Sequence, residues 1–358
     1  MIEKVFEDVL EEELGASFVA WQDGEEKISL HGGWRDRHQS EPWTATTMAP
    51  VWSATKGPMA AALYLALQKA GMDAQSEVRR VWPELRAGRD LTFGELFSHQ
   101  GGLAALDEKV SIWDYEAVIA ALERQVPKWT VGAHGYHPRT IGFLADELVR
   151  RLTGATLGDF FRREIAAPGG MDVWIGLPKA EQGRVAELVP ARAGSSGKPE
   201  EFYQALLRKE SLTRQAFSSP AEFTGVSEMN QPRAWEAGWP GMGGVASAVG
   251  LAKFYHWLGQ QSFFPEMAAR QAEGMDLIQQ VPSAFGFGLK FAEDGWVGHP
   301  GAGGSYGRHH PESGWSCAFV MNRFEANLFP SEKRLSLVRA LSGRLSGASL
   351  TGNEMSSP

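Results

Sequence analysis

A serine and a lysine three positions apart, Ser53 and Lys56, are residues whose types and spacing suggest nucleophilic chemistry. On a helix, residues at this spacing share one face, so the lysine amine can hydrogen-bond the serine hydroxyl. The N-terminus of a helix also favours developing negative charge. Ser53 follows apolar residues 48–52 and precedes the apolar stretch 58–67. The pattern predicts a nucleophilic serine, and a helix N-cap is the alternative interpretation.

The same Ser-x-x-Lys pattern occurs a second time, at Ser195 and Lys198. This second match lies in a Gly/Ser-rich segment beside Pro199, without an apolar helix after it. The surroundings therefore favour Ser53.

Two later segments could supply the other groups that an acyl transfer needs. Tyr136 precedes a predicted helix at 140–152, and a nearby lysine ammonium can lower the pKa of a tyrosine towards that of a general base. His299 and Gly301 end a predicted strand, where glycines let an N–H approach an acyl oxygen closely. The alternatives are a core tyrosine and a glycine-rich hairpin corner.

The elements that must position these residues are strands near both ends of the chain and helices between them. The predicted strands are 17–21, 27–31, 285–291, 295–299 and 315–321, and the predicted helices include 2–14, 112–124, 140–152, 157–165, 246–258 and 332–345. Because strands and helices do not alternate, a doubly wound parallel sheet is disfavoured.

We therefore predict an α+β fold. An antiparallel sheet is formed from both chain ends and flanked by terminal helices, with an inserted, mostly helical domain. Residues 1–60 plus 245–358 are expected to form the sheet domain, and residues 61–244 the helical domain.

Composition excludes several classes of function. The 358 residues include 43 acidic and 35 basic side chains, a net charge of −8 without a basic block, which argues against nucleic-acid binding. The apolar stretch 58–67 is shorter than the roughly 20 residues of a membrane span, and the acidic N-terminus lacks the features of a signal peptide. A cytoplasmic location is expected.

The single cysteine, Cys317, excludes an internal disulfide and a multi-cysteine metal site. No metal or cofactor is expected.

Three other motifs point elsewhere but lack the context that they require. Residues 303–307 match the Gly-x-Ser-x-Gly nucleophile elbow, yet no histidine follows His310 to complete a triad. Residues 241–246 imitate a dinucleotide-binding loop without a strand before them. His309 and His310 are expected to form a solvated strand end rather than a metal site.

The ordered set Ser53-x-x-Lys56, Tyr136 and His299-x-Gly301 resembles the serine β-lactamase and penicillin-binding-protein superfamily. The resemblance is strongest to the class C β-lactamase-like carboxylesterases. Three flanking stretches, 96–103, 241–247 and 298–304, also resemble this family, so that the likeness extends over about residues 45–325.

The resemblance implies an acyl-enzyme mechanism with Ser53 as nucleophile. Lys56 and Tyr136 would share the work of taking its proton and activating the deacylating water. The backbone N–H groups of Ser53 and Ala302 would form the oxyanion hole. In this family pattern His299 replaces the lysine of Lys-Thr-Gly. His299, Gly301 and Trp239 are expected to contact the substrate.

The sequence also departs from the β-lactamase pattern. Pro138 stands where class C enzymes carry the asparagine of Tyr-x-Asn, and Lys-Thr-Gly is absent. An esterase requires neither the asparagine nor the Lys-Thr-Gly lysine.

The predicted function is therefore a serine hydrolase, a carboxylesterase acting on short acyl esters. The alternatives are a β-lactamase or D-aminopeptidase, an acyltransferase, or a catalytically silent binding module. The expected partner is a small ester or amide substrate, and the sequence does not indicate an oligomeric state.

Overall fold

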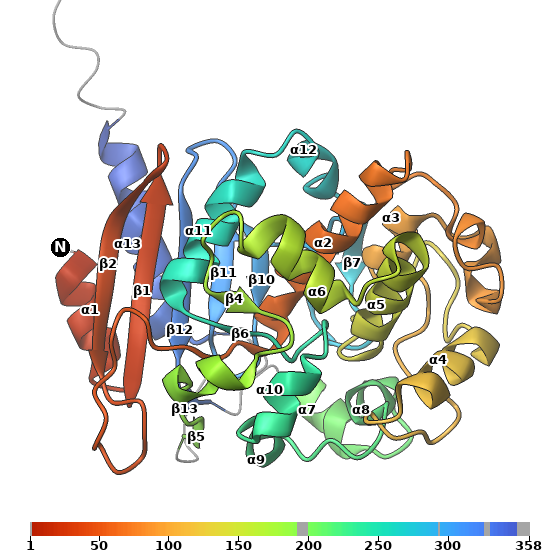
Figure 1. Ribbon diagram of the computed structural model, residues 1–358, viewed down its shortest axis with the longest axis horizontal. Helices are drawn as coiled ribbons and strands as arrows, with labels where there is room; N and C mark the ends of the chain where they lie inside the picture. Colours follow the sequence, from red (N-terminus) through yellow and green to blue (C-terminus); the bar gives the residue numbers. More distant parts are fainter. Residues whose placement is uncertain (1, 192–199, 293, 326–329, 349–358) are drawn as a thin grey trace, which may run out of the picture.

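The computed structural model describes residues 2–191, 200–292, 294–325 and 330–348 (Figure 1). Eight strands form one antiparallel sheet in the order β2-β1-β12-β11-β10-β9-β8-β7. Their bounds are β1 Gly15–Gln22, β2 Glu25–Gly33, β7 Ala272–Met275, β8 Pro282–Phe285, β9 Lys290–Phe291, β10 Val297–Pro300, β11 Tyr306–His309 and β12 Ser316–Met321. Since β1 pairs directly with β12, the predicted sheet built from both chain ends is confirmed.

Helices cover both faces of this sheet (Figure 1). The terminal helices α1 (Ile2–Leu10) and α13 (Glu332–Ala348) pack on one face, and α11 (Ala248–Gly259) packs on the other. Alternate residues of β1 serve the two faces: Phe18 joins the core under the terminal helices, whereas Val19 joins the core that includes α11. Burial on both faces explains why β1 is apolar without polar alternation.

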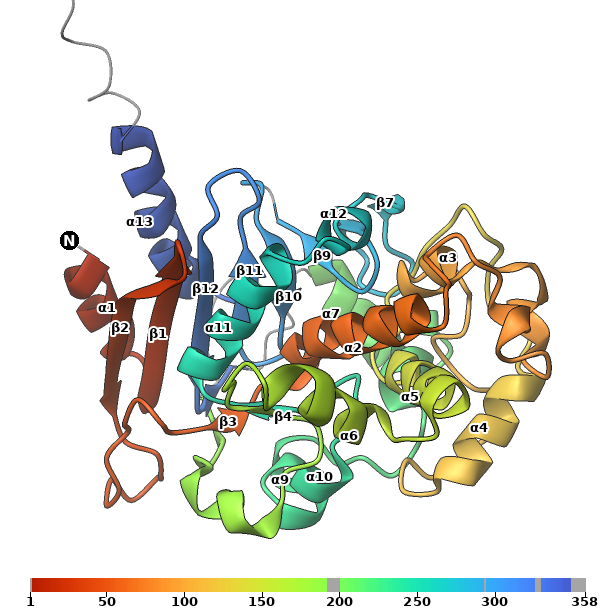
Figure 2. The same ribbon diagram turned by 45° about the horizontal axis from the view of Figure 1, so that its top comes forward.

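Between β2 and β7 the chain is mostly helical, as predicted. The helices there, besides α11, are α2 Lys56–Lys69, α3 Phe93–Phe97, α4 Tyr115–Arg124, α5 Thr140–Thr153, α6 Leu157–Phe161, α7 Glu200–Leu207, α8 Leu212–Ser218, α9 Val226–Met229, α10 Pro232–Ala237 and α12 Phe264–Met267. Figure 2 shows α2 in the middle of the molecule, between the sheet and α5. Among the helices that the structure describes, none has the length and apolarity of a membrane span. The division into a sheet domain and a helical domain at residues 60 and 245 stays a prediction.

Some element boundaries differ from those predicted. The strand expected at 285–291 is two strands, because Gly286 donates its N–H to the Leu289 carbonyl and closes a turn between them. The first helix ends at Leu10 rather than at residue 14. The expectation of a solvated strand end at His309 is wrong: His309 is buried, its Nδ1 lies 2.8 Å from Ser316 Oγ, and its ring contacts Phe264.

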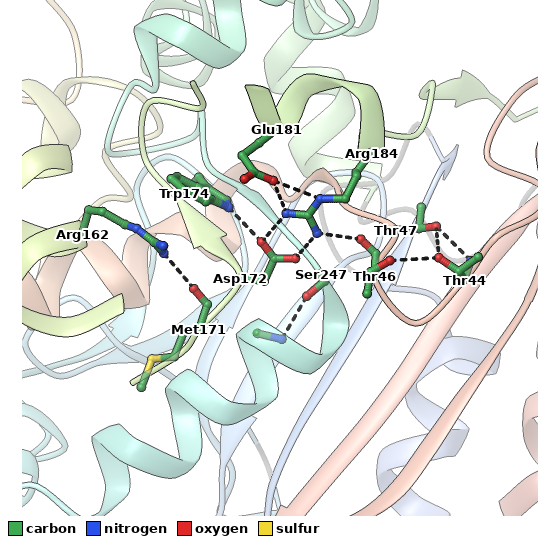
Figure 3. A network of polar contacts seen from close by, with 11 residues as sticks. Thr44, Thr46, Thr47, Arg162, Met171, Asp172, Trp174, Glu181, Arg184 and Ser247 are labelled. Atoms are coloured by element: carbon green, nitrogen blue, oxygen red, sulfur yellow. Dashed lines mark hydrogen bonds and ion pairs between the residues drawn. The ribbon is translucent and has the colours of Figure 1, made fainter. Parts of the chain in front are cut away.

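The segment that leads to Ser53 is fixed by a small sheet and by the polar network of Figure 3. β3 (Ala49–Pro50) pairs with β6 (Val245–Ala246), which also pairs with β4 (Val173–Trp174). Beside these strands, Arg184 donates to both Asp172 oxygens, at 2.6 and 3.0 Å, and to the Thr46 carbonyl at 3.1 Å. The chain therefore enters the Ser53 turn from a rigid support.

Candidate active site

Ser53 lies in the 3-10 turn Trp52–Thr55, directly before the buried helix α2. It is half-buried, whereas every other residue between 51 and 60 is buried. Lys56 Nζ lies 3.3 Å from Ser53 Oγ, the contact that the Ser-x-x-Lys spacing predicts. The second Ser-x-x-Lys match, at Ser195 and Lys198, lies outside the described residues.

The Lys56 amine is completely buried, and burial lowers its pKa well below the ordinary value of 10.5. Its Nζ donates to the carbonyl oxygens of Pro138, at 2.9 Å, and Gly241, at 2.6 Å. A neutral amine has two N–H donors and one lone pair. In that form, donation to the two carbonyls would leave the lone pair for the Ser53 hydroxyl. This arrangement suits a general base.

Tyr136 is brought to the same place and is 2% exposed. Its ring lies under Lys56, with Nζ 4.8 Å from the ring centroid. A hydrogen bond with Ser53 lowers the pKa of Tyr136, but burial raises it more, so that the net pKa lies above the ordinary value of 10.0. The expectation of a lowered tyrosine pKa is therefore wrong, because the buried phenolate would lose more solvation than its neighbours return.

Asp276 is a residue near the site that the sequence analysis missed. This fully buried carboxylate accepts, through Oδ1, the backbone N–H groups of Tyr136 at 3.0 Å and of Ile278 and Gln279 at 2.8 Å. Asp276 thus fixes the backbone that carries the Tyr136 phenol. No local signal marks this role, because the two residues are 140 positions apart in the sequence.

The segment after β10 reaches the Ser53 turn through a close backbone approach. A Cβ added to Gly301 would lie 2.1 Å from the Val51 carbonyl oxygen, so only glycine fits. This packing places the following residue, Ala302, beside the turn. Within the described ranges, the Ala302 N–H donates no hydrogen bond to another backbone group, and no such bond from the Ser53 N–H leaves its helical turn. The oxyanion role of these two N–H groups stays a prediction.

The C-terminal helix holds the rest of this loop. Arg334 of α13 donates from Nη1 to the Gly303 carbonyl and from Nη2 to the Arg323 carbonyl. Its Nε lies 2.5 Å from a carboxylate oxygen of Glu13, and both side chains are 2% exposed. The loop that carries Ala302 is therefore tied to both ends of the chain.

His299 is 2% exposed and stacks on Tyr136, with ring centroids 5.8 Å apart. Its Nδ1 lies 2.7 Å from the Pro300 carbonyl, so this nitrogen carries the proton in the neutral ring. Burial lowers the pKa of His299 well below 6.5, and Nε2 has no partner among the described residues. His299 therefore presents an unprotonated nitrogen beside Tyr136 rather than a cation like the lysine of Lys-Thr-Gly.

An aromatic wall borders Ser53. Trp52 has the unusual φ of 50° for a bulky residue, and its ring contacts Phe324 and Phe223 at centroid distances of 5.0 and 5.7 Å. Phe223 in turn contacts Trp239 at 5.7 Å. Trp239 also lines a cavity of about 220 Å³ together with Trp113 and Phe143. Phe223 thus links Trp239 to Trp52, the residue before Ser53, and the substrate contact of Trp239 stays a prediction.

The competing motifs do not form the sites that they imitate. Ser305 of the Gly-x-Ser-x-Gly match is fully buried and is followed by strand β11 instead of a helix. Residues 241–244 pack on the Ser53 turn, where the Gly244 N–H donates to Thr55 Oγ1 at 2.9 Å. The described part of the chain holds no cluster of three or more His, Cys, Asp or Glu residues suited to a metal ion.

Comparisons with known proteins agree with this geometry. The Beta-lactamase family model matches residues 2–341. The esterase/beta-lactamase LipL of Mycobacterium tuberculosis is 28% identical in an alignment of 332 positions that covers 86% of this chain and 77% of LipL.

Solved structures give the same result. A penicillin-binding-protein homologue from Caulobacter crescentus is 31% identical with a TM-score of 0.82, and a family VIII carboxylesterase is 28% identical with a TM-score of 0.83. In both comparisons 96% of each chain is covered. The predicted superfamily and fold are confirmed, and the relatives support the predicted serine hydrolase: the chain belongs to the Beta-lactamase family.

Proposed function

We propose that this protein is a carboxylesterase that hydrolyses small esters through an acyl-enzyme on Ser53. The contact between Ser53 Oγ and the buried Lys56 amine, whose pKa is lowered by burial, carries the proposal. Lys56 takes the hydroxyl proton as Ser53 attacks the ester carbonyl, and the N–H groups of Ser53 and Ala302 bind the developing oxyanion. The relatives named as an esterase and a carboxylesterase support this reaction.

Tyr136 assists both halves of the reaction as a neutral phenol. In acylation its O–H donates a proton to the leaving alkoxide, and the proton on Lys56 restores the phenol. In deacylation Lys56 and Tyr136 activate water, which attacks the acyl carbonyl and releases the acid and Ser53. A raised tyrosine pKa is compatible with this relay, because the phenol never has to rest as phenolate.

Esters are favoured over β-lactams by the chemistry at residues 138 and 299. The Pro138 carbonyl accepts the Lys56 N–H at 2.9 Å but offers no side-chain amide to a substrate. His299 offers a neutral ring rather than a cation for a β-lactam carboxylate. We propose that nitrocefin is a poor substrate beside p-nitrophenyl butyrate. A cytoplasmic location remains part of the proposal.

The decisive experiment is Ser53→Ala, assayed with p-nitrophenyl butyrate, nitrocefin and a D-Ala peptide. The variant should lose about 10³-fold or more in kcat on the ester, because the nucleophile is gone. Ser195→Ala is the matched control, since it removes the serine of the other Ser-x-x-Lys pattern. Unchanged turnover by Ser53→Ala would refute the mechanism, and nitrocefin as preferred substrate would refute the esterase. No turnover of any substrate by the wild type would favour a binding module.

A further inference from the structure

We propose that Arg139 binds a carboxylate of the substrate, so that the esterase prefers esters that carry a second, anionic group. The proposal rests on the proposed ester hydrolysis and narrows its substrate class. It comes from a half-buried arginine next to the Tyr136 segment, whose positive charge has no counter-charge among the residues that the structure describes.

Arg139 lies directly after Pro138, whose carbonyl oxygen accepts the Lys56 N–H. Its side chain is half-buried. Nη1 donates to the Pro220 carbonyl at 2.7 Å, and the guanidinium lies over the Phe223 ring, 5.0 Å from the centroid. A guanidinium has five N–H donors. Only the one to Pro220 has a partner within the described part of the chain.

No described residue balances the charge on Arg139. Within the described ranges Arg139 forms no ion pair, and burial alone lowers its pKa, to about 10, so that it remains a cation at neutral pH. The carboxylate of Glu222, next to Phe223 in the chain, accepts the Ser111 hydroxyl at 2.7 Å instead. A partly desolvated cation without a counter-ion is costly, and a bound anion would offset that cost.

The position of the guanidinium connects it to Ser53. Phe223, on which Arg139 lies, contacts Trp52, the residue before the nucleophile, and Trp239. Arg139 therefore stands at the aromatic wall that borders Ser53. A substrate with its ester at Ser53 and an apolar linker along this wall would bring a terminal carboxylate to the arginine fork, which suits bidentate binding.

The test compares matched esters with and without the charge. The first pair is p-nitrophenyl hemiglutarate and p-nitrophenyl valerate, which places the carboxylate in the acyl half. The second pair is 4-carboxyphenyl butyrate and phenyl butyrate, which places it in the leaving group. In the wild type, the ratio of kcat/KM for charged over neutral ester should exceed one in at least one pair.

In Arg139→Gln that ratio should fall by about tenfold to a hundredfold, mainly through KM, as expected for a lost charge-assisted hydrogen bond. Arg139→Lys should retain part of it. Arg162→Gln is the matched control, because Arg162 is also half-buried, lies over an aromatic ring (Trp174, 4.0 Å) and donates to one carbonyl (Met171, 3.2 Å; Figure 3). It should leave the ratio unchanged.

A wild-type ratio at or below one in both pairs would overturn the proposal, as would equal losses on charged and neutral esters in Arg139→Gln. A binding measurement separates this failure from failure of the proposed function. Calorimetric titration of Ser53→Ala with monomethyl glutarate needs no turnover. Binding should weaken by about tenfold or more when Arg139→Gln is added. Equal binding by both proteins would overturn the proposal even if ester hydrolysis is established.

Discussion

The chemistry of the site depends on how burial acts on two neighbouring side chains. Lys56 and Tyr136 lie in the same desolvated space, which lowers the pKa of the amine and raises that of the phenol. Both shifts favour the neutral form of the group. A neutral amine can accept the Ser53 proton, and a neutral phenol can donate one. Because burial shifts the two pKa values in opposite directions, Lys56 can act as the base and Tyr136 as the acid at one pH.

These pKa directions predict the pH profile of kcat/KM. Activity should fall as pH drops through the lowered pKa of Lys56, since the protonated amine cannot take a proton. On the alkaline side the profile should stay level to about pH 10, because the Tyr136 pKa lies above its ordinary value. Tyr136→Phe should lower the plateau about a hundredfold yet keep the acid limb. Loss of the acid limb in that variant would assign the limb to Tyr136.

At the scale of elements, the turn between β7 and β8 acts on a residue far away in the sequence. Asp276 in this turn holds the Tyr136 backbone N–H and the N–H groups of Ile278 and Gln279. The Ser283 hydroxyl adds a hydrogen bond to Oδ2 at 3.2 Å. Asp276 is therefore a positioning residue: it fixes where the phenol lies without touching the substrate.

Asp276→Ala should lower kcat by about tenfold or more with little change in KM, because the phenol loses its fixed place. The free energy of unfolding should fall by about 1–3 kcal/mol, as buried N–H groups lose their acceptor. Asp276→Asn, which keeps an acceptor oxygen, should recover most of kcat. The control is Asp73→Ala, which removes an exposed carboxylate from a similar turn. A rise in KM alone in Asp276→Ala would contradict a positioning role.

Helices and strands with a regular apolar pattern could be predicted from the sequence. Strands that form only because neighbouring strands pair with them could not. The helix at Thr140–Thr153 and the strand Ser316–Met321 match their predictions closely because their apolar spacing is regular. β11 (Tyr306–His309) contains Gly307 and has no strand pattern, and it forms because β10 and β12 pair with it on both sides. In the site, the spacing of Ser53 and Lys56 is local and predictable, whereas the contribution of Asp276 exists only in three dimensions.

At the scale of the whole molecule, the two ends of the chain close around the loop that carries Ala302. α1 and α13 lie side by side over one face of the sheet (Figure 1). Arg334 from α13 pairs with the buried Glu13 and donates to the Gly303 carbonyl. The terminal helices therefore stabilise the sheet and also hold the loop that carries Ala302.

Arg334→Leu should lower the free energy of unfolding by about 3–5 kcal/mol, because it leaves a buried carboxylate without its cation. The remaining folded enzyme should also show a lower kcat, since Gly303 loses its donor. Urea unfolding and ester turnover measure the two effects. Arg339→Leu removes an exposed arginine paired with Glu332 on the same helix and should change stability by less than about 1 kcal/mol. Equal effects of the two substitutions would argue against this role of Arg334.

The pairing of β1 with β12, and the contact of Gly301 with Val51, have a consequence for how the enzyme is made. A ribosome makes Ser53 and Lys56 well before it makes Ala302 and β12, the strand with which β1 pairs. An unfinished polypeptide therefore contains Ser53 and Lys56 but lacks Ala302 and the strand that completes the sheet. Hydrolysis begins only once synthesis has delivered both halves of the sheet.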